Sequence, residues 1–380
     1  MTMAERPVKP YFESKADKEA AAKKSSALNT ACQWAVDNQA GNEPLQSKDA
    51  FTRWSLALLA LIHGYDAVVA NNASPFVHLQ HQISGDTEGR FERGCRDVYY
   101  VLYWVVAFTL IRITVINKAL EPLARWGGVS SSRKVTRFGE QGWLVVYYVI
   151  SNSVGMYVMS TQPHWLNTRH FWIDYPEGHR QMTALMKSYY LVQMGFWFQQ
   201  IFVLLIEERR KDFVVMATHH IVTCNLMGWS LYMNYTRIGN AILCCMDFSD
   251  IFLSGTKCLR YLKLEKTSVV SFVVFIFTWI YTRHYLYMKI MYSIYSESLT
   301  YLPVDNWDPE NGSYYTRNVL FNFSILLGIL QLLIIYWFAL VLRIVYRVIF
   351  LSNLEDSRSD SESDGDDDED KRSLKEKKTE

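Results

Sequence analysis

The chain has 380 residues, a formal net charge of +1 and 50% hydrophobic residues. Taken as averages, these values would fit a soluble protein of two or three domains. The averages mislead, because charge is concentrated at the two ends and in short patches, whereas the middle carries apolar stretches of about 20 residues, enough for a helix to cross a bilayer. The near-neutral total says little about partners, and we expect none of them to be nucleic acid.

The expected elements begin with a polar segment. Residues 1–50 are rich in Ala, Lys, Glu and Ser and have no sustained apolar face, which predicts a disordered tail. Eight apolar stretches follow, at residues 54–71, 98–116, 142–160, 183–206, 213–233, 239–256, 268–290 and 319–350. We therefore predict an all-α fold, a polytopic membrane bundle of about eight transmembrane helices with six or seven forming its core.

Basic residues in the loops set the expected orientation. They follow the second, fourth, sixth and eighth stretches and include Arg112, Lys118, Arg125, Arg133, Lys134, Arg209, Arg210, Lys211, Lys257, Arg343 and Arg347. Short loops that carry Lys and Arg stay on the cytosolic side of a membrane. Both termini are therefore expected in the cytosol.

Short signals outside the apolar stretches point to the endoplasmic reticulum. The N-glycosylation sequons at Asn72 and Asn311 lie in the first and last expected lumenal loops. The chain ends with Lys377 and Lys378 followed by two residues, as in dilysine retrieval signals, which receptors read as addresses. We expect a multi-pass protein of the endoplasmic reticulum membrane.

Residues 351–380 form an acidic segment that we expect to be a disordered cytosolic tail. Ser357, Ser359, Ser361 and Ser363 each precede an acidic residue by three positions, a pattern that acidophilic kinases prefer. Phosphates there would add to an already negative tail. A purely solubilising tail explains the same composition equally well.

Ionisable residues inside two neighbouring stretches are the strongest functional signal, because charge within a membrane is costly. The fifth stretch carries His219 and His220, and the sixth carries Asp247 and Asp250. Counted from the ends of their helices, His219 and Asp250 each lie roughly 10 Å below the cytosolic boundary. A short turn at 234–239 would make the two helices antiparallel neighbours, so the imidazoles and carboxylates can meet.

Helical spacing sorts the surrounding residues onto faces. One polar stripe on the sixth helix consists of Asn240, Cys244, Asp247, Asp250, Ser254 and Lys257. On the fifth helix, His219 shares a face with Thr223, whereas His220 is turned by about 100°. We expect Thr223, Asn240, Ser254 and Lys257 to contact substrate. Arg283, within or near the seventh stretch, needs a partner, either structural or a substrate headgroup.

A buried imidazole beside a carboxylate can act as a base, or as a nucleophile that takes an acyl group from a thioester. Four alternatives are weaker. The chain lacks the histidine boxes of a di-iron centre, the ligand spacing of a zinc site and the internal repeat of a transporter. Two histidines that serve only helix packing would not explain the two carboxylates at matched depth. An H-x4-D acyltransferase box at His81 and Asp86 stands in an expected lumenal loop, away from cytosolic acyl-CoA. We expect no metal and no resident cofactor.

Three strings resemble the Lag1p motif of the ceramide synthase family. They are His219-His220-Ile221-Val222-Thr223, the run from Asn234 to Gly239, and the run from Met246 to Ile251 with Lys257. From about Arg133 to Arg347 the pattern is similar to the wider TLC domain (TRAM, Lag and CLN8), and the acidic tail is most similar to fungal members. The resemblance implies transfer of a fatty acyl group from acyl-CoA to a sphingoid base such as sphinganine or phytosphingosine.

The resemblance also implies roles and partners. His219, His220, Asp247 and Asp250 would be the catalytic residues. The basic residues at the cytosolic mouth are candidates for the CoA phosphates, or most of them serve only as charges that keep the loops cytosolic; they are Arg209, Arg210, Lys211, Lys257, Arg260 and Lys263. Endoplasmic reticulum lipids, a second copy, a paralogue in a heterodimer, and a small accessory subunit are the expected partners. The chain would then divide into a tail (1–50), two spans with a linker (51–132), a TLC domain (133–350) with the motif at 212–260, and the acidic tail.

Two points stay open at this stage. A TLC-domain protein without enzymatic activity, such as a lipid sensor, cargo receptor or translocation factor, could share the fold, although it has no evident need for four intramembrane ionisable groups. Acyl chain length is not readable from the sequence, since it depends on how deep a slot runs among the helices, toward the lumenal connection of the seventh and eighth.

Overall fold

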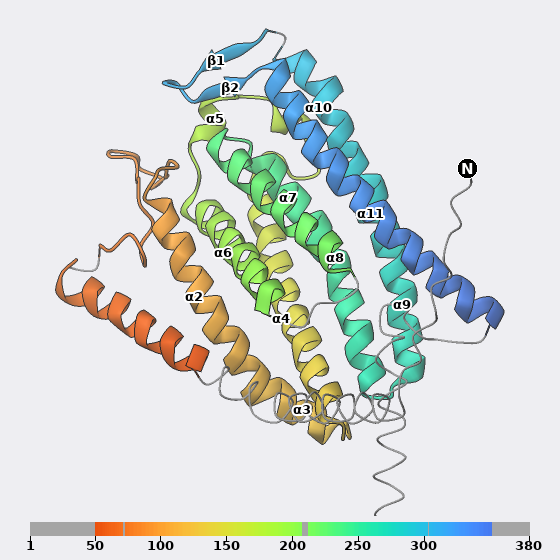
Figure 1. The fold of residues 1–380 in the computed structure, drawn as a ribbon. Helices are drawn as coiled ribbons and strands as arrows, with labels where there is room; N and C mark the ends of the chain where they lie inside the picture. The colour runs from red at the N-terminus through yellow and green to blue at the C-terminus, as the bar shows by residue number, and fades with distance from the viewer. Residues whose placement is uncertain (1–49, 71–72, 207–211, 303, 352–380) are drawn as a thin grey trace, which may run out of the picture. The chain divides into compact units, whose positions relative to one another are not determined.

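A computed structural model describes residues 50–70, 73–206, 212–302 and 304–351 (Figure 1). Several sequence predictions lie outside these residues. They are the sequon at Asn72, the basic residues Arg209, Arg210 and Lys211, the serines Ser357, Ser359, Ser361 and Ser363, and the terminal Lys377 and Lys378. The chain divides between residues 54 and 55. The fold described below is that of the second unit.

Helices make up nearly all of this unit. After a helix that ends at residue 68, the long helices are α2 (Asp97–Val115), α4 (Ser132–Ser160), α6 (Ala184–Ile206), α7 (Phe213–Tyr232), α8 (Thr236–Tyr261), α9 (Glu265–Trp279), α10 (Tyr287–Tyr301) and α11 (Arg317–Leu351). Two π-helical turns are η1 (Ile116–Leu120), which leads from α2 into α3 (Glu121–Trp126), and η3 (Ile280–Leu286), which joins α9 to α10. The short elements are η2 (Thr168–Phe171), α5 (Glu177–Arg180) and an antiparallel hairpin of β1 (Asn306–Asp308) and β2 (Ser313–Tyr315).

The predicted polytopic helical bundle is confirmed, since each of the eight apolar stretches contains a helix. Six helices in the described part of the chain are long and apolar enough to cross a membrane, namely Asp97–Trp126, Ser132–Ser160, Ala184–Ile206, Thr236–Tyr261, Glu265–Tyr301 and Arg317–Tyr346. The helix ending at residue 68 and α7 fall short of this measure. In α7 the cause is polar content, because His219, His220 and Asn225 lower the hydropathy of an otherwise apolar helix.

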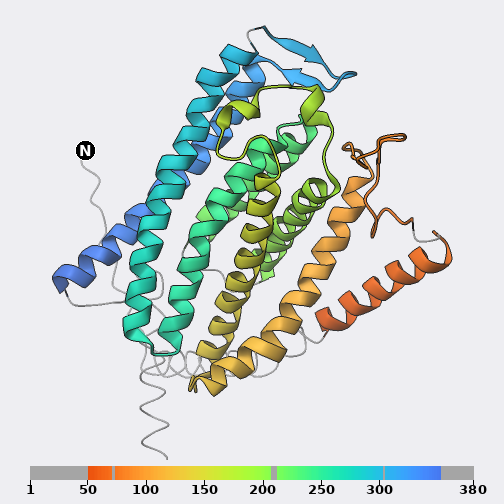
Figure 2. The same cartoon turned by 180° about the vertical axis from the view of Figure 1, so that it is seen from behind.

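The long helices pack in two layers. Seen from behind, α9 with α10, α8 and α4 lie side by side (Figure 2). Seen from the front, α6, α7 and α11 cover them, and α2 lies against α6 at the edge (Figure 1). Helices α7 and α8 therefore lie in opposite layers and face one another across the middle of the bundle.

Close approach between the layers depends on small residues. At Gly155 of α4, an added Cβ would lie 2.5 Å from the Tyr189 hydroxyl oxygen and 2.8 Å from the Cys244 sulfur. A larger residue at this position would therefore force α4 away from α6 and α8. The absence of a side chain here lets α4 pack closely against both α6 and α8.

Loops and the hairpin cap one end of the bundle, which we call the hairpin end. Asn234 forms the turn from α7 to α8 with a φ of 63°, a left-handed conformation that Asn tolerates better than most residues. Its amide nitrogen donates to the carbonyl of Gly312, 2.8 Å away, and its amide oxygen accepts from Arg93 Nε at 3.1 Å. The predicted short turn between the two helices is confirmed, and it is pinned to the hairpin.

Candidate active site

A large cavity, here called the polar cavity, lies between the two layers in the half of the bundle away from the hairpin. It contains about 1460 Å³ of empty space, including its open mouth. The residues that line it include Tyr148, Trp197, His219, His220, Asp250, Ser254, Lys257, Arg283 and Trp337. The structure therefore gathers most of the residues that the sequence singled out around one space.

His219 and His220 enter this cavity from the middle of α7. The His219 ring lies between two indoles, with centroid distances of 5.4 Å to Trp197 and 5.2 Å to Trp337. In each histidine, Nδ1 is buried and has no hydrogen-bond partner. Nε2 is therefore the nitrogen that a ligand in the cavity can reach. Within the described residues, neither imidazole is hydrogen-bonded to a carboxylate.

Asp250 faces the same cavity and is paired with Arg283. The Asp250 Oδ1 atom lies 2.7 Å from Nη2 of Arg283, and the same nitrogen donates to the carbonyl of Met246 at 2.9 Å. The guanidinium carbon lies 3.9 Å from the ring centroid of Trp279. Arg283 belongs to the π-helical turn η3, a deviation from α-helix that often marks a functional site. The partner that the sequence required for Arg283 is thus Asp250.

Asp247 points away from the polar cavity, toward α4 and α6. Its Oδ2 atom accepts hydrogen bonds from Ser151 Oγ at 2.8 Å and from Gln193 Nε2 at 3.0 Å. Gln193 is held in turn by the Tyr147 hydroxyl, which donates to its Oε1. Asp247 is only 1% exposed and does not line the cavity. The structure brings His219, His220 and Asp250 together and places Asp247 behind them.

The predicted polar stripe on α8 divides at the same point. Toward the hairpin end, Asn240 is fully buried, where its amide oxygen lies 3.1 Å from Nε2 of His164 and its amide nitrogen donates to the Gly155 carbonyl. Burial lowers the pKa of His164 to about 4 and so keeps this loop imidazole neutral. Toward the other end, Ser254 and Lys257 line the polar cavity. Of the expected substrate contacts on α8, Asn240 thus lies outside both sets of cavity-lining residues.

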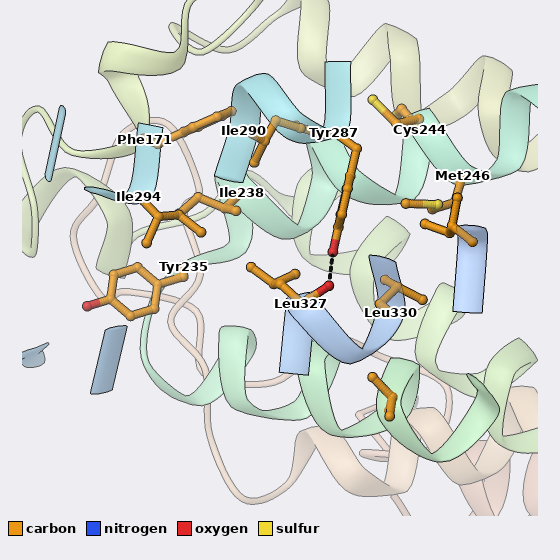
Figure 3. Packing of buried hydrophobic residues seen from close by; sticks show 14 of the residues in the cluster. Phe171, Tyr235, Ile238, Cys244, Met246, Tyr287, Ile290, Ile294, Leu327 and Leu330 are labelled. Carbon is orange, nitrogen blue, oxygen red and sulfur yellow. Dashed lines mark hydrogen bonds between the residues drawn. The ribbon is translucent and has the colours of Figure 1, made fainter. Parts of the chain in front are cut away.

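A second, almost purely hydrophobic cavity, here called the apolar cavity, continues from the first toward the hairpin end. It contains about 750 Å³ of empty space. The residues around it include Trp172, Tyr190, Trp197, His219, Thr223, Ser230, Tyr235, Ile238, Gly239, Met246, Ile294, Leu320, Phe323, Leu327 and Leu330. Figure 3 shows the packing of buried hydrophobic residues that include several of these, such as Ile238, Met246 and Leu330. In the same cluster the Tyr287 hydroxyl donates to the Leu327 carbonyl at 2.8 Å and ties α10 to α11.

His219, Trp197 and Met246 line both cavities, so the imidazole stands where they meet. Thr223, one turn further along α7, lines the apolar cavity and has a buried hydroxyl without a partner. The predicted shared face of His219 and Thr223 is confirmed. An amphiphile could lie with its tail in one cavity and its polar end in the other, with the reacting atom beside His219.

Sequence reasoning missed the residues that surround the named ones. Ser151 and Gln193 carry a signal that could have found them, since polar side chains within membrane spans seek partners across helices. Trp197 and Trp337 carry none, because tryptophan is common in apolar helices and only the fold shows which indoles flank His219. Tyr148 also lines the polar cavity, and the sequence does not distinguish it from the other tyrosines in the apolar stretches.

The remaining predicted sites include three basic residues at and just beyond the end of α8. Lys257 lines the polar cavity, whereas Arg260 and Lys263 do not. Asn311 is exposed between the two strands of the hairpin, and its amide nitrogen donates to Asp308 Oδ2 at 2.6 Å.

Comparison with known proteins agrees with this architecture. Residues 137–343 match the TLC domain of the TRAM, LAG1 and CLN8 family. The chain is 37% identical over 287 residues to sphingosine N-acyltransferase lag1 of Schizosaccharomyces pombe, covering 76% of this chain and 72% of that protein. The chain belongs to the ceramide synthase family of TLC-domain proteins.

Other relatives extend the likeness. Sphingosine N-acyltransferase lac1 of the same yeast is 35% identical over 330 residues, covering 85% of this chain and 84% of that protein. Ceramide synthase LAG1 of Saccharomyces cerevisiae is 33% identical over 303 residues, covering 76% and 70%. These matches confirm the resemblance that the motif indicated. The matched TLC region, 137–343, contains the histidine pair and also Arg283 of the π-helical turn η3.

Proposed function

We propose that this chain is a ceramide synthase, which transfers a fatty acyl group from acyl-CoA to the amine of a sphingoid base such as sphinganine. The observation that carries the proposal is the position of His219 at the junction of a polar and an apolar cavity. Both substrates are amphiphiles, so each needs a low-dielectric slot for its tail and a wet site for its polar end. The names of the relatives support the same reaction.

The acyl tail would lie in the apolar cavity, with its thioester carbonyl at His219 Nε2. In one sequence of steps, Nε2 attacks this carbon, the carbon–sulfur bond breaks, and CoA leaves as a thiolate that takes up a proton. The sphingoid ammonium gives this proton to the thiolate, the neutral amine nitrogen then attacks the acyl-imidazole, the carbon–nitrogen bond to the ring breaks, and a second amine proton passes to the freed imidazole. In the other sequence, the neutral amine attacks the thioester carbon directly, His219 takes up its proton, and the carbon–sulfur bond breaks so that CoA leaves as a thiolate.

The polar cavity would hold the charged ends of the substrates. The Asp250 carboxylate is the group that fits a sphingoid ammonium, and Arg283 balances its charge while the site is empty. Lys257, which also lines the cavity, is a candidate for the CoA phosphates. Asp247 would act indirectly, by fixing α8 against α4 and α6. The proposed reaction requires no resident cofactor, since acyl-CoA enters as a substrate.

The proposed cellular setting follows from where acyl-CoA is found. The polar cavity would open to the cytosol, the hairpin end would face the lumen of the endoplasmic reticulum, and both termini would be cytosolic. The sequon at Asn311, exposed on the hairpin, and the basic loops at the other end support this orientation. A second copy, a paralogue or a small membrane subunit would be compatible partners.

Turnover by the full-length protein, purified in detergent and supplied with sphinganine and labelled acyl-CoA, tests the function. His219→Ala is expected to lower kcat/KM by at least about 1000-fold, the scale on which removal of a catalytic nucleophile or base acts. His81→Asn, at an exposed position in the 73–96 loop whose φ of 61° asparagine tolerates, is the matched control and should retain turnover. Absence of ceramide with every substrate pair, or full activity of His219→Ala, would contradict the proposal.

Mass spectrometry separates the two reaction sequences. Incubation with acyl-CoA alone should leave an acyl group on the peptide that carries His219 if the imidazole acts as nucleophile. A peptide that stays unmodified in wild type, together with an inactive His219→Ala variant, would instead assign His219 as the base.

A further inference from the structure

The apolar cavity reaches a rigid aromatic wall at the hairpin end. The wall consists of Trp172 from the loop before α5, Tyr235 from the turn before α8, and Phe323 from α11. Trp172 donates from its indole nitrogen to Ser293 Oγ at 2.8 Å, and the Tyr235 ring packs edge-on against Phe323 with centroids 5.6 Å apart. Because each ring is held by a neighbour, the rings do not move aside easily, and the wall limits how far an acyl chain can extend into the cavity.

The Tyr235 ring is held from its other side as well. It stacks on Tyr175 with a centroid distance of 5.1 Å and an interplanar angle of 11°. The Tyr175 hydroxyl donates to the Met233 carbonyl at 3.1 Å and accepts from the backbone nitrogen of Tyr314 at 2.9 Å. The hairpin, the loop before α5 and the α7–α8 turn thus support the same wall.

The distance from His219 to this wall can be read from two helices. On α7 the cavity is lined from His219 to Ser230, eleven residues that rise about 16 Å. On α11 it is lined from Leu330 to Leu320, ten residues that rise about 15 Å. An extended hydrocarbon with bonds of about 1.52 Å advances about 1.25 Å per carbon, so roughly 13 carbons span this depth.

We propose that the aromatic wall of Trp172, Tyr235 and Phe323 sets the acyl chain length, and that the enzyme prefers acyl groups of about 14 to 16 carbons, whose extended lengths of about 16 to 19 Å come closest to this depth, over those of about 24 to 26. The inference rests on the proposed function and specifies the substrate of that same site. A chain of about 26 carbons would extend about 31 Å, nearly twice the distance available.

A second feature controls the width of the cavity near its end. Tyr190 of α6 is fully buried and donates to Ser230 Oγ, which itself donates to the Met227 carbonyl at 3.1 Å. A Cβ added at Gly239 of α8 would collide with the Tyr190 hydroxyl and lie 2.9 Å from its ring carbon Cζ. Only glycine at 239 therefore lets Tyr190 keep this position beside the cavity, and a methyl group there would push the phenol into the acyl path.

The test measures kcat/KM of the full-length protein with sphinganine and acyl-CoAs from C12 to C26. Wild type should show its maximum at C14 or C16 and a value at least tenfold lower at C24. Trp172→Ala, which removes part of the aromatic wall, should move the maximum by four or more carbons toward longer chains. Trp165→Ala, a partly exposed tryptophan in the same loop, is the matched control and should leave the profile unchanged.

Two variants act in the opposite direction and do not depend on an alanine cavity being tolerated. Gly239→Ala should lower the rate with C16 at least tenfold relative to C12, because Tyr190 then narrows the slot. Ile294→Phe, which adds volume to the lining of the same cavity, should shift preference the same way. Size-exclusion profiles of each variant report whether it is folded.

The outcomes separate the inference from the proposed function. A wild-type maximum at C24 or C26, or an unchanged chain-length profile in folded Trp172→Ala or Gly239→Ala, overturns the chain-length inference while ceramide production leaves the function intact. Absence of ceramide from wild type with any acyl-CoA would remove the proposed function itself.

Discussion

Asp247 and Asp250 are three residues apart on one helix, yet their surroundings differ completely. Three residues turn an α-helix by about 300°, so the two side chains leave α8 about 60° apart. That angle is enough to direct Asp247 toward Ser151 and Gln193 in α4 and α6, and Asp250 toward Arg283 in the polar cavity. Each carboxylate therefore has partners suited to a different role.

The ion pair of Asp250 and Arg283 predicts a specific pattern in a double-mutant cycle. Arg283→Met leaves a carboxylate unpaired inside the bundle, which should cost up to about 3 kcal/mol of stability and lower kcat/KM for sphinganine by at least about 100-fold. In the double variant with Asp250→Asn the stability should largely return, whereas turnover should not. Thermal melts and kinetics of the four proteins measure both quantities.

Arg260→Met, at an exposed position on the same side, is the control and should change neither quantity. Recovery of turnover in the double variant would show that Asp250 serves only to neutralise Arg283.

The chemistry of single residues was predictable where membrane burial makes them costly. His219, His220, Asp250 and Arg283 were found because an ionisable group in an apolar stretch needs a reason to be there. The direction of Asp247 was not predictable, because a 60° difference has meaning only once the neighbouring helices are known. The indoles beside His219 were hidden for the same reason.

At the scale of elements, apolar runs located the helices but not their ends. The seventh predicted stretch, 268–290, is in fact a continuous helical rod from Glu265 to Tyr301, because the helix continues through a Tyr- and Ser-rich segment that hydropathy does not mark. The short hairpin of β1 and β2 was not predicted either. Six residues in two strands leave too little alternation to recognise.

The turn between α7 and α8 depends on Asn234. Asn234→Ala loses the hydrogen bonds to Arg93 and Gly312 and places alanine at positive φ, so stability should fall by about 2–3 kcal/mol. Asn234→Gly should lose less, since glycine accepts this backbone conformation. Thermal unfolding in detergent ranks the two variants.

Asn225→Ala provides the comparison for this turn. That amide lies on the exposed face of α7 and donates only to the Ile221 carbonyl of its own helix. Equal melting temperatures for the Asn234 and Asn225 variants would show that the turn does not hold the bundle.

For the molecule as a whole, acid sensitivity is expected from the loops that cap the hairpin end, which contain two buried neutral histidines. Burial lowers the pKa of His164 to about 4 and that of His179 to about 3, whereas an unfolded histidine titrates near 6.5. Between these values the unfolded chain binds more protons, so stability is full above about pH 6.5 and falls as the pH drops toward 4. Each histidine can contribute about 1.4 kcal/mol per pH unit in that window.

We therefore expect the melting temperature to fall from pH 7 to pH 5 in wild type. A double variant with His164→Asn and His179→Gln should show a flatter dependence, even if it is less stable at pH 7. His81→Gln, in an exposed loop, should keep the wild-type slope. A slope that survives the double substitution would assign the acid sensitivity to other groups.

The meeting of the two cavities at His219 also decides what water can do there. Water that entered the polar cavity would reach the same imidazole that would carry an acyl group, because His219 lines both cavities. If His219 acts as nucleophile, its acyl-imidazole would be open to hydrolysis, and release of the acyl group as free fatty acid would compete with amide formation whenever no amine is bound. A sphingoid headgroup that displaces this water would then shield the intermediate as well as accept its acyl group.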